Sequence, residues 1–196
     1  LNARAIWEHR SLIPEEFYPS TETRILNVNL IGAFFYGLTG NMNLSMGLAC
    51  SVMLVILVIS YAGLLRNLGF RKESCALGML LLLALPGNLR HAQLLFVWAD
   101  YYAIHCIIML VTLRAWLSAI DEKRGWKIWV CAACALSFVI SLSGLRAALI
   151  CYAPLMLTEL IRWLNAVLKK SWTREFLRGG SCALGCLTMA FCGSLS

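Results

Sequence analysis

Two adjacent carboxylates, Glu15 and Glu16, stand between Pro14 and Phe17 near the start of the chain. An ionised and suitably placed carboxylate is a general base, able to take the proton from a hydroxyl group as that group attacks an electrophile. Adjacent carboxylates in a turn are also common as plain solvated groups. The sequence therefore leaves two interpretations of this pair open, a catalytic base and a solvated turn.

Arg146 directly follows Ser143-Gly144-Leu145 at the start of an apolar segment. If a helix begins there, its free N–H groups and the guanidinium face the same anion. A phosphate or diphosphate ester fits such a site, and Arg90 stands in another polar turn between apolar segments. The alternative interpretation is an arginine that snorkels to ordinary lipid headgroups.

A third polar group interrupts the apolar run 94–113, with Asp100, Tyr101 and His105. Tyr101 and His105 are one helical turn apart and so share nearly the same face. A carboxylate at membrane depth costs about 2.5–3.5 kcal/mol at a helix centre on insertion scales. We therefore expect Asp100 to face a water-filled cavity or to pair with an arginine. His105 is interpreted either as a pocket residue or as a hydrogen-bonded packing residue.

The composition indicates the environment in which these groups lie. Apolar residues make up 60% of the 196 residues and charged residues only 14%. A soluble domain of this length could not bury so much apolar surface. We therefore predict an integral membrane protein with an all-α fold.

A helix needs about 20 apolar residues to cross a bilayer, and segments of about this length follow one another along the chain. One of them is short and ends near Pro86, so it either crosses at a tilt or re-enters. The chain begins without Met and stops inside an apolar run, which we interpret as a fragment of a longer protein. The sequence predicts a polytopic transmembrane helix bundle of about five or six spans, at residues 44–65, 74–89, 94–113, 126–143, 145–163 and 179–196, the last of them truncated.

Basic residues alternate between the connecting loops. Most of the 17 Lys and Arg residues follow the first, third and fifth spans, and short loops rich in Lys and Arg stay cytoplasmic. The net charge of +7 is thus explained by topology, and no nucleic-acid partner is expected. Residues 1–43 then form an outer-face loop, in which 25–38 is predicted to be an interfacial helix on the membrane lipids.

The nine cysteines lie in or beside apolar runs and are interpreted as small buried hydrophobic residues. Cys131 and Cys134 form a C-x-x-C pair without a second pair or a nearby histidine, so no metal site is predicted. The sequence also lacks a glycine-rich phosphate loop and the motifs of serine hydrolases and zinc proteases. No cofactor is therefore predicted.

The order of acidic outer loop, surface helix and first span resembles bacterial polytopic membrane glycosyltransferases of the GT-C class. The runs Asp100-Tyr101-Tyr102-x-x-His105 and Ser143-Gly144-Leu145-Arg146 look like segments of such families. In these enzymes the usual base is Asp, whereas this loop supplies only Glu.

This resemblance implies a multi-pass enzyme of the bacterial cytoplasmic membrane that serves cell-envelope assembly. It would transfer a sugar from a polyprenyl-phosphate-linked donor to a glycan or lipid acceptor on the outer face. It also implies roles for the residues named above: Glu15 or Glu16 as base, Arg90 and Arg146 as phosphate ligands, and Asp100, Tyr101 and His105 as pocket residues.

Two other functions stay open. The Ser-Gly-x-Arg feature is shared with O-antigen polymerases and ligases, which use outer-face arginines on lipid-diphosphate glycans. A transporter or flippase would instead use Asp100 and His105 as an intramembrane relay, and the Pro86-Gly87 break as part of a discontinuous helix.

Overall fold

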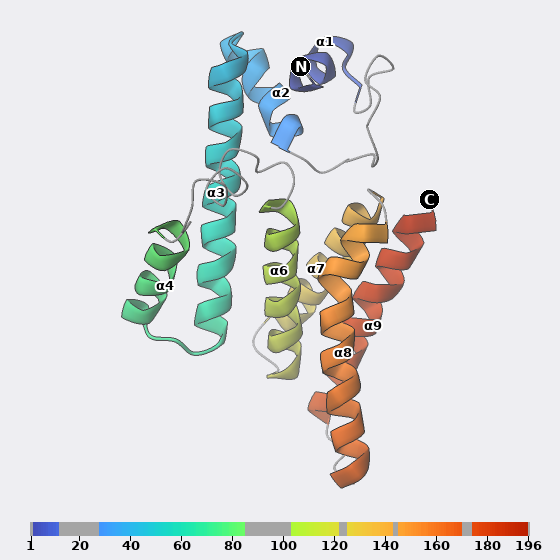
Figure 1. The fold of residues 1–196 in the computed structure, drawn as a ribbon. Helices are drawn as coiled ribbons and strands as arrows, with labels where there is room; N and C mark the ends of the chain where they lie inside the picture. Colours follow the sequence, from blue (N-terminus) through green and yellow to red (C-terminus); the bar gives the residue numbers. More distant parts are fainter. Residues whose placement is uncertain are drawn as a thin grey trace.

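The computed structural model describes residues 2–11, 28–84, 103–121, 125–142, 145–169 and 174–195. Within these ranges every regular element is an α-helix (Figure 1). The all-α prediction is therefore confirmed for the described part of the chain. Its helices are α1 (Asn2–His9), α2 (Val28–Thr39), α3 (Met42–Asn67), α4 (Lys72–Ala84), α6 (Ala103–Ile120), α7 (Trp126–Ser141), α8 (Leu145–Lys169) and α9 (Arg174–Leu195).

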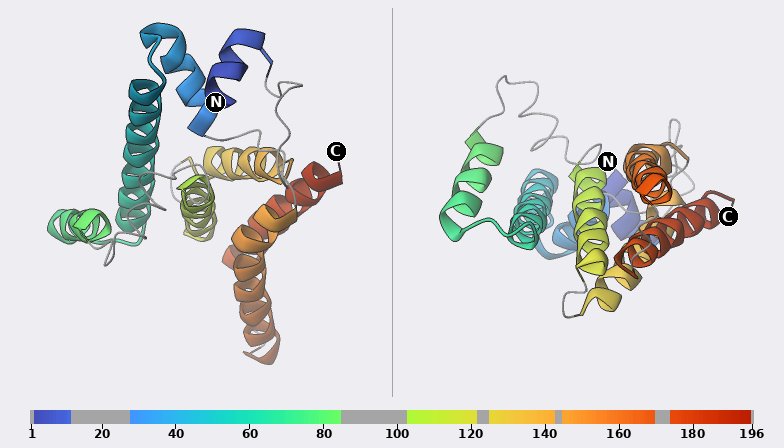
Figure 2. Two further views of the ribbon diagram at one scale, coloured as in Figure 1. Left: turned by 45° about the horizontal axis from the view of Figure 1, so that its top comes forward. Right: turned by 90° about the horizontal axis from the view of Figure 1, so that it is seen from below.

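The long helices run between two ends of the molecule (Figure 1). We call the first the α1 end; α1 and the start of α3 lie there, while α6 and α8 begin further along, level with the middle of α3. At the opposite end, which we call the basic end, α3, α6 and α8 finish, and α9 begins there. In every view α3 lies between α4 and α6 (Figures 1 and 2). As the loop charges predict, α3, α6 and α8 run in one direction and α9 in the other.

Two of the described helices, α3 and α6, are long and apolar enough to cross a membrane. Their most apolar stretches of 18 residues have mean hydropathies of 2.5 and 1.8. At 1.5 Å per residue, the 26 residues of α3 measure about 39 Å. α8 and α9 have comparable lengths but carry charged residues. A membrane protein is supported by these two helices, and the total of five or six spans stays a prediction.

The third predicted span needs a correction at its inner boundary. It was expected to end at residue 113, with Arg114 in the following loop, but α6 continues to Ile120. Arg114 therefore lies inside the helix, where its guanidinium carbon is 3.9 Å from the centre of the Trp129 ring. A contact with an aromatic face helps an arginine to stay within a helix of this kind. Residues 94–102 lie outside the described residues.

The predicted interfacial helix corresponds to α2, which begins at Val28 and packs against both α1 and α3. The turn to α3 depends on Gly40, whose φ of +64° suits glycine. The side chain of Asn41 then caps α3 by accepting hydrogen bonds from the backbone N–H groups of Asn43 (3.0 Å) and Leu44 (3.2 Å). α1 was not expected from the sequence, and it ends before the two prolines of this region.

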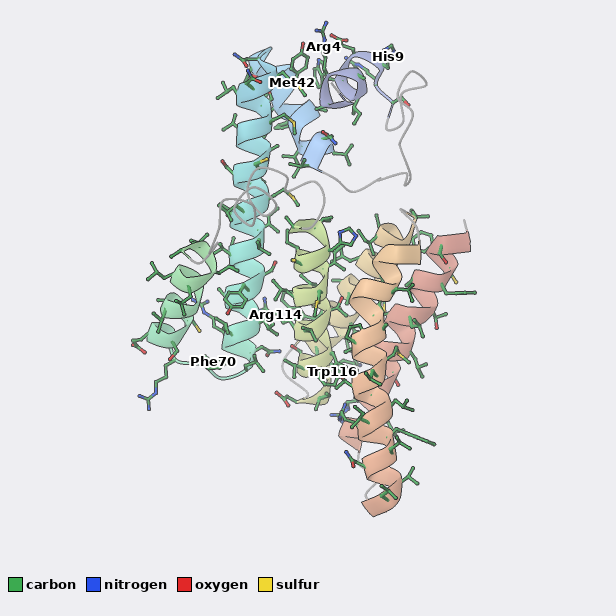
Figure 3. All side chains as sticks on the ribbon, viewed as in Figure 1. Arg4, His9, Met42, Phe70, Arg114 and Trp116 are labelled. Carbon is green, nitrogen blue, oxygen red and sulfur yellow. The ribbon has the colours of Figure 1, made fainter. Side chains whose placement is uncertain are left out.

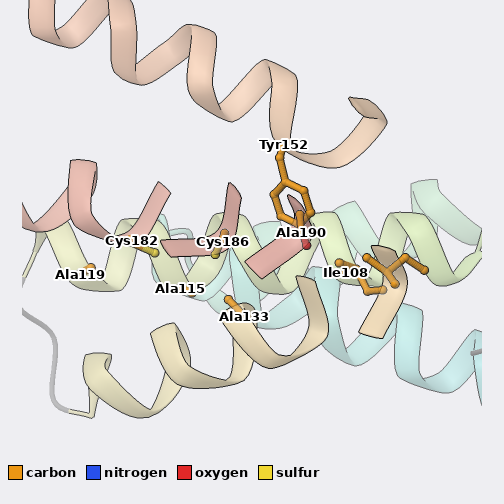
Figure 4. Close-up of a cluster of buried hydrophobic side chains, with 9 residues drawn as sticks. Ile108, Ala115, Ala119, Ala133, Tyr152, Cys182, Cys186 and Ala190 are labelled. Atoms are coloured by element: carbon orange, nitrogen blue, oxygen red, sulfur yellow. The ribbon is translucent and has the colours of Figure 1, made fainter. Parts of the chain in front are cut away.

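Small side chains line the region where α6, α7, α8 and α9 meet. Its buried cluster combines alanines and cysteines with the fully buried Tyr152, which points from α8 towards α9 near Ala190 (Figure 4). α7 packs most extensively against α9 and also contacts α8. Small residues allow this because they let helix backbones approach closely.

The interpretation of the cysteines as buried hydrophobic residues is correct only for some of them. Cys75, Cys182 and Cys186 are buried, and the sulfur of Cys134 lies 4.0 Å from that of Cys186. Three others are exposed on helix surfaces, because an apolar run does not indicate which of its faces meets a neighbour. These exposed residues are Cys106, Cys131 and Cys192.

We expect Gly193→Ala to destabilise the protein by about 1–3 kcal/mol, because a Cβ at this position would overlap the carbonyl oxygen of Phe138 on α7. Gly180→Ala on the same helix is the matched control, since no atom lies within 4 Å of a Cβ there. The control should be neutral or stabilising by up to about 1 kcal/mol. Thermal unfolding of the full-length protein measures both changes, and equal effects would contradict close packing at Gly193.

Candidate functional site

The residues predicted for the site fall unevenly on the described structure. Five of them lie outside it, namely Glu15, Glu16, Arg90, Asp100 and Tyr101. His105 is described and is half-buried in the first turn of α6. Arg146 is the second residue of α8, which confirms that it opens a helix, but its side chain is outside the described part.

His105 and Arg146 nevertheless belong to helices that start at the same level of the molecule. α6 and α8 contact each other, and both begin on the side that faces α1, level with the middle of α3 (Figure 1). The structure therefore brings the backbone positions of these two residues to the same level of the bundle.

An open cleft of about 360 Å³ lies at the α1 end, between α1 and α2. Its walls are mainly apolar, and its polar lining residues are Arg10 and Ser11. Arg10 follows the last turn of α1 with a φ of +50° and is exposed. The complete lining consists of Ile6, Trp7, Arg10, Ser11, Leu30, Ala33 and Phe34.

The two faces of α1 explain how this helix forms one wall of the cleft. Ala3 and Ile6 on one face of α1 are buried against Ala33 of α2. On the outer face Arg4 donates a hydrogen bond of 2.7 Å to Glu8 one turn later, and this bond together with the carboxylate charge raises the pKa of Arg4.

Arg10 differs from Arg4 because no carboxylate pairs with it among the described residues. A guanidinium that keeps its N–H donors free can bind an anion. The arrangement thus suits a ligand with an apolar body and an anionic group.

A second cluster of charged residues lies towards the basic end and joins α6 to α8. The carboxylate of Glu159 accepts hydrogen bonds from the indole N–H of Trp116 and from Nη1 of Arg162, the latter at 2.6 Å. The guanidinium carbon of Arg162 lies 5.3 Å from the centre of the Trp116 ring. Gly179 of α9 leaves the space for this pair, because a Cβ there would lie 2.6 Å from Nη1 of Arg162. Trp116 and Arg162 are thus both fixed in position around the carboxylate of Glu159.

This cluster includes residues that the sequence analysis did not single out. Glu159 and Arg162 are three residues apart on α8, and Glu159 is only 6% exposed. Trp116 was missed because nothing in its local sequence distinguishes it from the other tryptophans. The cluster locks two helices together and offers no open space to a substrate. The cleft at the α1 end is therefore the better candidate for ligand binding.

We expect Glu159→Ala to lower the free energy of unfolding by about 2–3 kcal/mol, because Arg162 and the Trp116 N–H lose their buried acceptor. The matched control is Glu8→Ala, which breaks an ion pair whose side chains are 58% and 46% exposed. Exposed pairs contribute less than about 1 kcal/mol. Denaturant unfolding with tryptophan fluorescence measures both variants, and similar losses would show that Glu159 is not a buried structural partner.

Comparison with known proteins provides no relative from which a function could be transferred. No protein-family model, no curated protein and no solved structure matches this chain. An inference about function therefore depends on its own residues and geometry.

Proposed function

We propose that this chain is part of a multi-pass glycosyltransferase of the bacterial cytoplasmic membrane. The enzyme would transfer a sugar from a polyprenyl-phosphate-linked donor to a glycan or lipid acceptor on the outer face. The observation that carries the proposal is the α1-end cleft, which joins an apolar wall to the unpaired cation of Arg10. A polyprenyl phosphate has the matching chemistry, an apolar chain that ends in an anion.

The positions of the candidate acids along the chain also bear on where the reaction would take place. Glu15 follows Ser11, a lining residue of the cleft, by four residues. Since each residue spans at most about 3.6 Å, the Cα atoms of these two residues are within about 14 Å. Tyr101 precedes the start of α6 by two residues, and Asp100 by three. Glu15 and Glu16 are therefore tethered close to the cleft, and Asp100 and Tyr101 to the start of α6, which packs against the middle of α3.

In the proposed reaction Glu15 or Glu16 takes the proton from the acceptor hydroxyl. The acceptor oxygen attacks the anomeric carbon of the sugar, and the bond from this carbon to the lipid phosphate breaks. Arg90 and Arg146 stabilise the negative charge that the leaving phosphate develops. Asp100, Tyr101 and His105 shape the pocket around the reacting groups.

A transporter would instead use Asp100 and His105 as its relay. Glu159, the buried carboxylate of the described part, is committed to Trp116 and Arg162 rather than to a water-filled path. An O-antigen polymerase or ligase would use the same arginines on a lipid diphosphate. The donor chemistry in the assay below distinguishes it.

We expect either Glu15→Gln or Glu16→Gln in the full-length protein to lower sugar transfer about 10²–10⁴-fold, because the amide accepts no proton from the hydroxyl. The measurement is the turnover of a polyprenyl-phosphate-linked sugar in membranes, with donor binding recorded separately. Glu8→Gln controls for the loss of a carboxylate on α1 and should leave turnover unchanged. If both glutamine variants keep full activity, neither residue is the base.

We expect Arg10→Gln to raise the KM for the lipid donor several-fold while kcat changes little, because the lost contact binds the ground state and the transition state alike. Arg4→Gln is the matched control, since the Arg4 guanidinium is already paired with Glu8. An unchanged KM in Arg10→Gln would separate the cleft from donor binding.

A further inference from the structure

Arg114 is a half-buried cation between three helices near the basic end. Its position in α6 is six residues, or about 9 Å, before the last residue of this helix. Figure 3 shows it between α3 and α6. On the α7 side its guanidinium lies over the ring of Trp129, at 3.9 Å from the centre. On the α3 side it meets Gly63, where a Cβ would overlap Nη1.

The charge of Arg114 is not balanced by the residues described around it. Arg4 pairs with Glu8 and Arg162 with Glu159, and Arg114 is in neither of these ion pairs. Arg66, in the last turn of α3, is a second cation whose charge repels that of Arg114. A partly desolvated cation next to a second, exposed cation is stabilised by an anion.

The surroundings of Arg114 are held in place by hydrogen bonds. The side-chain amide of Asn67 on α3 donates to the carbonyl oxygen of Arg114 (3.1 Å) and to the hydroxyl of Ser118 (3.0 Å). These bonds join the end of α3 to α6 and keep Arg66 and Arg114 near each other. The ring of Trp129 covers one face of the guanidinium and leaves the N–H donors in its plane available. Such donors match the oxygens of a phosphate.

We propose that Arg114 and Arg66 bind the phosphate of an anionic phospholipid where α3, α6 and α7 meet. Basic pockets between transmembrane helices on the cytoplasmic side bind anionic headgroups. A lipid is favoured over a soluble anion because exposed apolar side chains continue along α3 from Arg66 away from the basic end, among them Ile59, which is 62% exposed, and Val55. These side chains contact acyl chains while the arginines hold the headgroup. The site lies at the opposite end from the cleft and does not depend on the proposed enzymatic function.

The test compares the full-length protein in nanodiscs of phosphatidylcholine with nanodiscs of equal parts phosphatidylcholine and phosphatidylglycerol. The Tm of the wild type rises with phosphatidylglycerol. Arg114→Gln loses most of this rise and binds phosphatidylglycerol about tenfold more weakly in native mass spectrometry. Lys72→Gln, which removes an exposed cation at the same end, keeps the full rise.

The circular dichroism of each variant in phosphatidylcholine reports whether it folds. If Arg114→Gln does not fold, Arg66→Gln takes its place, because Arg66 is exposed and its loss removes half of the proposed positive charge. In that variant, a partial loss of the Tm increase caused by phosphatidylglycerol supports the site. An undiminished rise in a folded Arg114→Gln variant overturns the proposal. The proposal also fails if inorganic phosphate raises the Tm in phosphatidylcholine as much as phosphatidylglycerol does, since the ligand would then be a soluble anion.

Discussion

Close packing of small side chains between α6, α7 and α9 is the constraint on which the arrangement of the helices depends. Ala115, Ala133, Cys186 and Ala190 are buried where these helices meet, and Gly193 touches the backbone of α7. Lipid tails are as apolar as leucine, so helices in a bilayer associate through dispersion contacts and a few hydrogen bonds rather than through the hydrophobic effect. Short side chains increase these contacts because the backbones come nearer. α8 lies against these helices, and Trp116 of α6 donates a hydrogen bond to the carboxylate of its Glu159–Arg162 ion pair.

The two ends of the molecule differ in how their charged side chains are paired. Near the basic end, Glu159 is buried but satisfied by two donors, whereas Arg114 rests on an indole and has no carboxylate. At the α1 end, Arg10 is left at the edge of an apolar cleft while the neighbouring Arg4 is paired. Burying a charge without a partner is costly, so Arg114, which pairs with no carboxylate among the described residues, gains from an anionic ligand; Arg10 is exposed, but it too pairs with no described carboxylate. We infer one such ligand at each end, a lipid-linked donor and a phospholipid.

Much of the helical framework could be predicted from the sequence, and less of the site. The span predicted at 44–65 falls within α3, and the helix expected before Arg146 begins at Leu145. These predictions succeeded because length, apolar composition and turn residues are local properties. The placement of Arg114 in the loop after the third span was wrong, because its aromatic partner Trp129 lies 15 residues away in another helix and is not evident from the local sequence.

The sequence by itself determined the all-α fold, the approximate helices and the alternation of basic loops along the chain, because hydropathy and loop charge are set by neighbouring residues. Tertiary structure alone decided which faces meet. α3 and α6 are apolar on all sides, and a helix without an apolar stripe does not indicate which side is buried. Only packing therefore placed Cys186 in the interior and Cys192 at the surface, and only packing brought the indole of Trp116 to the carboxylate of Glu159.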